Sequence, residues 1–308
     1  MAEDALIYLT NQIDPKGLGA TIYVTEDMVR ADRLGVTYQG TMKNHELALY
    51  GNRTDERLSS LSASDQEKLL TAARDKLYSC YVCGGEHMAI KGFRPQAFDQ
   101  NEETFRILET LGMIYDAGFQ AGVVYRPGHE NATWPYAIEG YNLYAVPVST
   151  YLINDERVYL SDRYLKEEKK LGGSQWYDLL VKKFNECSEN GDPMVVIFSN
   201  QVSGSGDYLD AYKKFIDYAV SRQAAFVTTL QLVDMAAARK RGGHIGAIAQ
   251  ANESQLSANA SEVGVIANCP SCDKSGDVAV GSVINVTVQK GNKCLSCIQN
   301  STNSTQNA

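Results

Sequence analysis

Short apolar runs alternate with longer amphipathic stretches through the first 240 residues of this chain, and that alternation is what most constrains its fold. The apolar runs that we expect to form strands are 20–24, 45–50, 90–93, 122–125, 144–148, 194–198 and 225–229. The amphipathic stretches that we expect to form helices are 64–77, 102–111, 176–187 and 208–223. Strands that are separated by helices run parallel in one sheet and bind ligands at their carboxyl ends. The pattern therefore predicts an α/β fold with a parallel sheet or barrel.

The composition changes at about Arg241. Residues 241–262 are rich in Gly, Ala, Ser and Asn without apolar periodicity, which is typical of a linker. Residues 263–298 contain three short apolar runs framed by cysteine pairs, and we expect a small β module there. Residues 299–308 are almost entirely Asn, Gln, Ser and Thr, which predicts a disordered tail.

Charge and hydropathy exclude several classes of protein. The chain has a net charge of −8 and lacks a long run of Lys and Arg, so we expect no nucleic-acid partner. It has no stretch of 18 apolar residues, so we expect no transmembrane helix. The first residues are acidic and do not resemble a signal peptide. We therefore expect either a cytoplasmic protein or a chain that begins downstream of its natural start.

Six of the seven cysteines form C-x-x-C pairs, namely Cys80/Cys83, Cys269/Cys272 and Cys294/Cys297. The last two pairs have the spacing of a four-cysteine zinc site, because each C-x-x-C turn can bring two thiolates to one metal ion. The alternative is a pair of disulfides in an extracellular module. Either reading predicts that these four cysteines converge.

Seven N-x-S/T sequons favour export and glycosylation. They begin at Asn52, Asn131, Asn252, Asn259, Asn285, Asn300 and Asn303. Most of them follow residue 250, where a polar segment also creates such motifs by chance. We interpret the set as that of a secreted or surface-exposed glycoprotein, which makes disulfides at the cysteine pairs more plausible.

The order of several segments is similar to that of NodB-type polysaccharide deacetylases of carbohydrate esterase family 4. Residues 19–25 resemble the family's "ATFFV" strand, 45–51 its "GHEIxxH" strand and 91–95 its "GFRPP" motif. Residues 104–116, 144–149, 193–198 and 226–228 resemble later family segments in the same order. The resemblance covers residues 5–238 and implies a distorted (β/α)7 barrel of the glycoside hydrolase and deacetylase type. The small β module expected at 263–298 would follow this barrel.

The family hydrolyses acetamides with a divalent metal held by Asp, His and His, together with an Asp base and a His acid. Carried over residue by residue, the two metal-binding histidines map to Tyr50 and Thr54, and the acid histidine maps to Ser199. The strand that carries the paired aspartates would precede this chain. Arg94, which orients the base in the family, and Asp116 remain as candidate catalytic residues. The resemblance thus implies a degenerate metal site, and we expect no metal at the barrel mouth.

Glycan binding is the activity that these residues favour. Tyr50, Asp55 and Asn200 map to loops at the expected barrel mouth, and Trp134 belongs to an aromatic stretch whose rings can stack on sugars. We therefore expect a deacetylase-like domain that binds a glycan or cell-wall polysaccharide, with impaired or absent catalysis. An active metal-dependent deacetylase with its first strand missing is one alternative, and a structural cell-surface module is the other.

Overall fold

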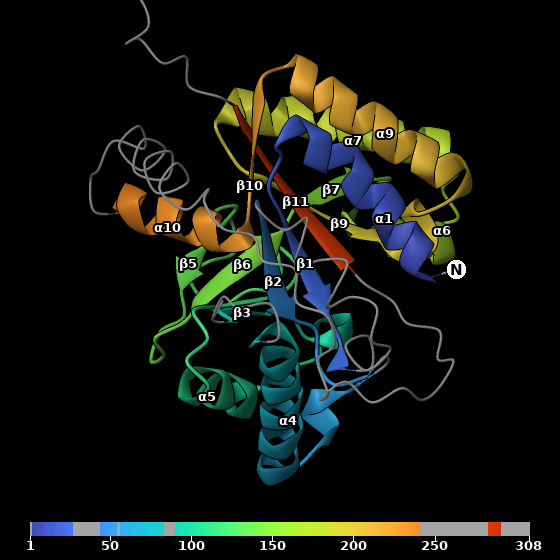
Figure 1. The fold of residues 1–308 in the computed structure, drawn as a ribbon. Coiled ribbons are helices and arrows are strands. Elements are labelled where there is room, and N and C mark those ends of the chain that lie inside the picture. The colour runs from blue at the N-terminus through green and yellow to red at the C-terminus, as the bar shows by residue number, and fades with distance from the viewer. Residues whose placement is uncertain (1, 27–43, 54–55, 83–89, 241–282, 291–308) are drawn as a thin grey trace, which may run out of the picture.

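The computed structural model describes residues 2–26, 44–53, 56–82, 90–240 and 283–290 (Figure 1). Its central sheet contains five parallel strands in the order β1 (Ala20–Val24), β2 (His45–Leu49), β3 (Gly92–Phe93), β4 (Tyr115–Gln120) and β6 (Tyr144–Val148). The short strand β5 (Tyr136–Ala137) pairs antiparallel with β6. Helices connect several of the parallel neighbours, as the alternation of apolar and amphipathic stretches predicts.

The other side of the sheet is built around a strand from the C-terminal part of the chain. Strand β11 (Val283–Lys290) runs antiparallel to β1 along one edge and to β9 (Met194–Ser199) along the other. It also pairs antiparallel with β10 (Ala224–Val227). Sequence analysis assigned residues 283–288 to a separate module, whereas the structure places them in the main sheet. The rest of the predicted module and tail lies outside the described residues.

Strands β6 and β9 approach each other through a few polar contacts. The N–H of Ser149, next to β6, donates to the carbonyl of Val195 at 3.0 Å, and the Val195 N–H donates to the Ser149 hydroxyl at 2.9 Å. The fold is therefore mixed α/β with a mostly parallel sheet. It departs from seven regular β/α units, because the strand between β1 and β9 is antiparallel.

Helices cover the sheet, and short segments connect to them. The helices are α1 (Ala2–Ile13), α4 (Ala63–Val82), α5 (Glu102–Thr110), α6 (Asp162–Glu167), α7 (Gly173–Asn190), α8 (Asn200–Ser203), α9 (Gly206–Ser221) and α10 (Thr229–Lys240). Single 3₁₀ turns are η1 (Asp14–Lys16), η2 (Leu58–Ser60) and η3 (Gln96–Phe98). Among the described residues, no helix has the length and apolar character that a membrane crossing requires.

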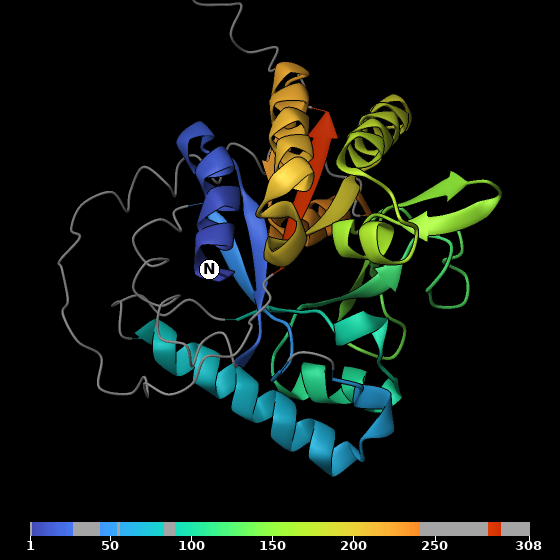
Figure 2. The ribbon, with the colours of Figure 1, turned by 90° about the vertical axis from the view of Figure 1, so that its right-hand side faces the viewer.

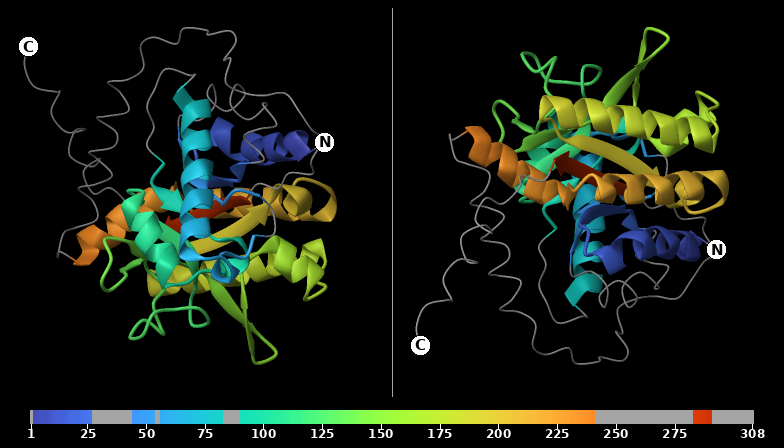
Figure 3. Two further views of the ribbon diagram at one scale, coloured as in Figure 1. Left: turned by 90° about the horizontal axis from the view of Figure 1, so that it is seen from below. Right: turned by 90° about the horizontal axis from the view of Figure 1, so that it is seen from above.

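The helices form two groups around the sheet. Helix α7 packs against α9, with α1 beside α9, while α4 packs against α5 at the other side of the molecule (Figures 1 and 3). The hairpin of β7 (Thr150–Ile153) and β8 (Glu156–Tyr159) projects from the body of the fold (Figure 2). This hairpin was not anticipated from the sequence.

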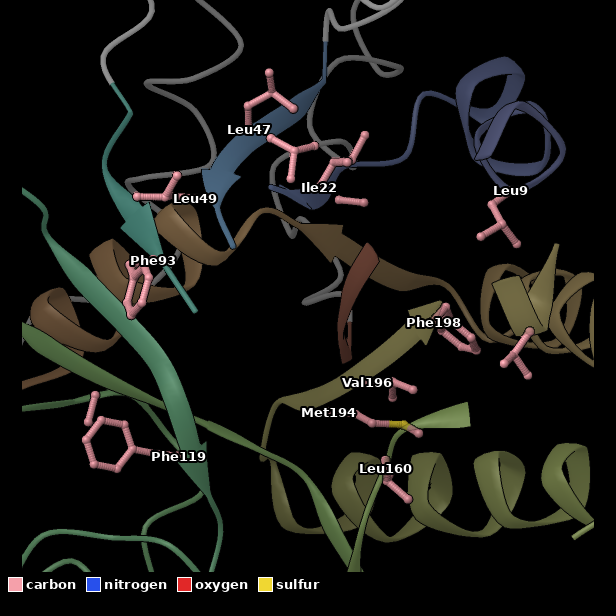
Figure 4. Packing of buried hydrophobic residues seen from close by; sticks show 14 of the residues in the cluster. Leu9, Ile22, Leu47, Leu49, Phe93, Phe119, Leu160, Met194, Val196 and Phe198 are labelled. Carbon is pink, nitrogen blue, oxygen red and sulfur yellow. The ribbon is translucent and has the colours of Figure 1, made fainter. Parts of the chain in front are cut away.

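Both faces of the sheet are buried. Successive side chains of a strand point to opposite faces, so each strand contributes to both. One face packs Ile22, Leu49 and Phe198 beneath the surrounding helices (Figure 4). The opposite face gathers Tyr23, Tyr115 and neighbouring apolar residues around Leu232 and Val233 of α10. A sheet covered on both faces needs continuous apolar strands rather than alternating ones.

One predicted strand is wrong in position. We expected a strand at 122–125, but β4 lies at Tyr115–Gln120 and residues 121–123 form a turn. Gly122 adopts φ +69°, a left-handed conformation that suits a turn. The sequence of β4 contains Asp116 and Gly118, so its apolar signal is weaker than that of 122–125.

Candidate functional site

A pocket of about 290 Å³ opens at the carboxyl ends of β2, β3 and β9. Its lining combines arginine, tyrosine, serine and glutamate side chains from loops that follow these strands and from α6. It is formed by Tyr50, Arg57, Arg94, Pro95, Gln96, Ala97, Phe98, Tyr159, Ser161, Arg163, Tyr164, Glu167, Glu168, Ile197, Ser199 and Gln201. In parallel α/β folds, the functional loops lie at the carboxyl ends of the strands, which is where the sequence analysis expected ligands to bind.

The loop after β2 is held by a buried carboxylate. Glu56 accepts hydrogen bonds from the backbone N–H of Asn52 at 2.9 Å and of Arg53 at 3.2 Å. Gly51 has φ +92°, and a Cβ there would meet the Glu56 carboxylate. Gln96 donates to the carbonyl of Tyr50 at 2.8 Å. These contacts fix the backbone that presents Tyr50 to the pocket.

Arg94 lines the pocket although it is only 2% exposed overall. Its N–H continues the ladder from β3 by donating to the carbonyl of Leu49 at 2.9 Å. Its guanidinium carbon lies 5.3 Å from the ring centroid of Tyr23 and 5.4 Å from that of Phe98. Burial lowers the pKa of the guanidinium, while Tyr23, Tyr50 and Asp116 oppose that shift. Aromatic faces therefore hold a buried cation at the base of the pocket.

Asp116 lies behind Arg94 on β4 and is fully buried. One carboxylate oxygen, Oδ1, accepts from the N–H of Gly118 at 2.7 Å. The other, Oδ2, has no hydrogen-bond partner among the described residues. Burial raises the pKa of Asp116 to about 7, although the Gly118 hydrogen bond and the Arg94 charge lower it. A carboxyl group in this setting can change protonation state near neutral pH.

One wall of the pocket is aromatic. The rings of Tyr159, at the end of β8, and Tyr164, on α6, stack with centroids 4.1 Å apart and an angle of 15° between their planes. Phe98 meets Tyr159 edge-on at 5.0 Å. Sequence analysis missed Tyr159 and Tyr164, since only the fold brings the hairpin and α6 beside Arg94.

A third buried carboxylate supports the part of the pocket that is formed by the end of β9 and by α6. Asp162, the first residue of α6, accepts from the N–H of Ser199 at 2.8 Å and from the Ser203 hydroxyl at 2.7 Å. It also accepts from the N–H of Arg163 at 2.6 Å. Burial raises the pKa of Asp162 to about 7 against the effect of these hydrogen bonds. Asp162 thus ties the end of β9 to the start of α6, and both contribute residues to the pocket.

A separate polar cluster lies near the amino ends of the strands. Glu46 on β2 accepts from the Thr21 hydroxyl at 2.8 Å, the Tyr115 hydroxyl at 2.8 Å and the N–H of Leu230 at 3.0 Å. The last contact places a carboxylate at the start of α10, where the helix dipole favours negative charge. Desolvation nevertheless raises the pKa of Glu46. This cluster anchors α10 against the face of the sheet that carries Tyr23 and Tyr115.

Comparison with solved structures places this geometry in a known fold. A protein from Mycobacterium smegmatis that is provisionally described as a polysaccharide deacetylase aligns with a TM-score of 0.52 and 19% sequence identity, over 70% of each chain. The chain has the NodB-like fold of the CE4 polysaccharide deacetylases. The search by sequence gives no further match, since neither a protein-family model nor a curated protein matches this chain.

Two more structures are similar to this chain. A CE4-family pseudoenzyme from Bacillus anthracis aligns with a TM-score of 0.49 and 10% identity, over 75% of this chain and 61% of the other. The CE4 domain of a multidomain xylanase from the hindgut metagenome of Trinervitermes trinervoides aligns with a TM-score of 0.46 and 14% identity, over 78% and 84%.

Some of the residues that were singled out from the sequence lie together in the structure, and others lie apart. Tyr50 and Arg94 both line the pocket, and Asp116 lies behind Arg94. Asn200 is buried between Ser199 and Gln201, which line the pocket in its place. Trp134 is not part of the lining.

Trp134 packs against α10 instead. The guanidinium of Arg239 lies 4.7 Å from the centroid of its ring. Other predicted residues lie outside the described part of the chain, namely Thr54, Asp55, Cys80 (side chain only), Cys83, Cys269, Cys272, Cys294 and Cys297.

The described residues of this pocket do not fit the zinc ion that the family resemblance implies. Zinc is bound by His, Cys and carboxylate side chains. The two described positions that correspond to family histidines carry a phenol, Tyr50, and a hydroxyl, Ser199, and the Arg94 guanidinium already brings a positive charge. No group of three or more His, Cys, Asp or Glu within the described ranges could hold a metal ion.

Proposed function

We propose that this chain is a deacetylase-like domain that binds a polysaccharide in the pocket between Arg94 and the tyrosine pair, and that its hydrolytic activity is impaired or absent. The observation that carries the proposal is the placement of the stacked Tyr159 and Tyr164 rings beside the Arg94 cation. A sugar ring is apolar on its faces and polar at its edge. The tyrosine wall suits the faces, and an arginine suits a carbonyl or hydroxyl oxygen.

The remaining lining supports the same ligand. Ser161, Ser199 and Gln201 supply hydroxyl and amide groups that can both donate and accept hydrogen bonds, as sugar hydroxyls require. The cavity of about 290 Å³ is large enough for one or two sugar units and opens to solvent, so the rest of a polymer can extend away.

Weak or absent hydrolysis follows from the chemistry of the lining. A general acid for amide cleavage needs a pKa near the working pH, and the hydroxyl of Ser199 cannot supply one. Asp116 has a pKa of about 7, but it is fully buried and does not line the pocket. Arg94 would therefore bind the ligand, and Asp116 would act as a positioning residue behind it.

We further propose that β1, β2, β3, β4, β6, β9 and β11 form a distorted seven-stranded barrel with the pocket at its mouth. The Ser149–Val195 hydrogen bond, which bridges β6 and β9, supports closure. The sequons support a secreted or surface location, where polysaccharides are accessible.

Binding of N-acetylglucosamine oligomers and other polysaccharide fragments by titration calorimetry tests the proposal. We expect Tyr164→Ala to weaken binding by about 1–3 kcal/mol, the usual cost of losing an aromatic anchor. Tyr125→Ala is the matched control, since Tyr125 is 42% exposed and does not line the pocket. Equal affinities for the two variants would contradict the assignment of the pocket.

Acetate release from the same oligomers, measured with and without added zinc, tests the catalytic part. We expect no release above the background of a heat-denatured sample. Release that Arg94→Ala abolishes would establish an active deacetylase instead. Absence of binding to every glycan tested would favour a structural module.

A further inference from the structure

Strand β11 occupies a slot whose two walls are strands of the same direction. Its residues 283–285 pair with Thr21–Tyr23 of β1, and its residues 283–288 pair with Met194–Ser199 of β9. Because β11 is antiparallel to both, β1 and β9 run parallel to each other across it. Neighbouring strands lie about 4.7–4.9 Å apart, so β1 and β9 are separated by roughly 10 Å.

Without β11, this slot would expose the unsatisfied edges of β1 and β10 on one side and of β9 on the other. The backbone groups of β1 and β9 that face β11 belong to strands whose residues are all buried. An open edge of that kind readily accepts another extended segment. The sequence of β11, Val-Ile-Asn-Val-Thr-Val-Gln-Lys, is rich in β-branched residues, which favour strands.

The position of β11 in the chain sets it apart from the other strands. Helix α10 ends at Lys240 and β11 begins at Val283, so a long connection precedes it. The other described strands and the helices are all formed by residues 2–240. β11 can therefore leave the sheet without disrupting the chain connections among residues 2–240. A strand that lies between two helices in the sequence cannot leave in this way.

We propose that the gap between β1 and β9 is a binding site for an extended peptide strand, and that residues 283–290 fill it as a removable intramolecular ligand. The register links this site to the pocket. Val283 is paired with Ser199, which lines the pocket, and with Tyr23, whose ring lies under Arg94. Insertion of β11 thus aligns the ends of the two strands that carry these residues.

Proline substitution in the full chain tests the proposal, because proline cannot donate to a strand ladder. Val286 and Thr287 are adjacent in β11, so one N–H group points toward β9 and the other toward the side formed by β1 and β10. We expect the double variant Val286→Pro/Thr287→Pro to lower the thermal midpoint by about 5–10 °C. Ser304→Pro, in the tail that the sequence predicts to be disordered, is the control and should leave the midpoint unchanged.

A labelled peptide with the sequence of residues 283–290 then reports on the site itself. We expect fluorescence anisotropy to show at least tenfold tighter binding to the double proline variant than to the wild-type chain, whose site is filled. An excess of unlabelled peptide should raise the midpoint of the variant toward that of the wild type, and a scrambled peptide should not. An unchanged midpoint, or a peptide that binds neither chain, overturns the proposal.

Hydrogen exchange on the unmodified chain remains decisive even if the variant fails to fold. In low denaturant, amides of 283–290 should exchange through an opening that leaves β2 and β4 protected. Exchange of β11 only together with β2 and β4 would show that it is not removable, and immediate exchange of β11 would show that the site is empty. None of these measurements involves a glycan, so their outcome is independent of the proposed ligand of the pocket.

Discussion

The backbone N–H of Ser199 donates a 2.8 Å hydrogen bond to Oδ2 of Asp162, and this contact joins the end of β9 to the start of α6. Ser199 lines the pocket, and α6 carries the Tyr164 ring of the aromatic wall. Asp162 and Ser203 are fully buried and Ser199 is 5% exposed, so the two donors from Ser199 and Ser203 have little access to water as an alternative partner. The shape of the pocket therefore depends on one carboxylate that does not line it.

Replacing Asp162 tests this dependence. We expect Asp162→Ala to lower the free energy of unfolding by about 2–4 kcal/mol, because it leaves buried donors unsatisfied. Ser203→Ala removes only one of those donors and should cost about 1 kcal/mol. Denaturant unfolding measures both values. If the two variants were equally stable, Asp162 would not be the anchor that the geometry indicates.

Variants of Arg94 and Trp134 should affect different properties, namely glycan affinity for Arg94 and stability for Trp134. Arg94 lines the pocket, and we expect Arg94→Ala to weaken glycan binding by about 1–3 kcal/mol. Trp134 instead packs against Arg239, so Trp134→Ala should lower the unfolding free energy by about 1–3 kcal/mol with little effect on affinity. Calorimetric titration and denaturant unfolding of both variants check this contrast. If only Trp134→Ala lost affinity, the glycan would bind at the aromatic stretch around Trp134 and not in the pocket.

Asp116 should make stability depend on pH. Its pKa is about 7 in the folded chain and about 4 in an unfolded chain, so between these values the folded state holds a proton that the unfolded state releases. Its contribution to stability is therefore present below pH 4 and lost as the pH rises to 7. As the pH rises across that range, we expect the free energy of unfolding of Asp116→Asn to increase by up to about 4 kcal/mol relative to that of the wild type. Asp178→Asn, at an exposed site on α7, is the control and should show no such gain in unfolding measured at each pH.

The cysteine pairs near the C-terminus remain a prediction from the sequence. If Cys269, Cys272, Cys294 and Cys297 hold zinc, thiol titration of the native chain should rise by four equivalents after chelation. If they form disulfides, chelation should change nothing and reduction should release the thiols. Four thiols that react freely before either treatment would contradict both interpretations.

The sequence alone specified the elements that depend on neighbours in the chain. The strands β1, β2 and β6 lie at the apolar runs, and α5 lies within the helix predicted at 102–111. Periodicity and capping are local, so they can be recognised without knowledge of the fold. The series of motifs also led to the deacetylase fold and to the pocket residues Tyr50 and Arg94.

Contacts between distant segments were decided only by the tertiary structure. Residues 283–290 lie between β1 and β9, Tyr159 and Tyr164 complete the pocket, and Trp134 packs on α10. A strand carries no local signal for its partner, because any edge with free backbone groups can pair with it. An aromatic side chain is equally suited to a core, a helix or a ligand, and packing against the rest of the fold selects among them.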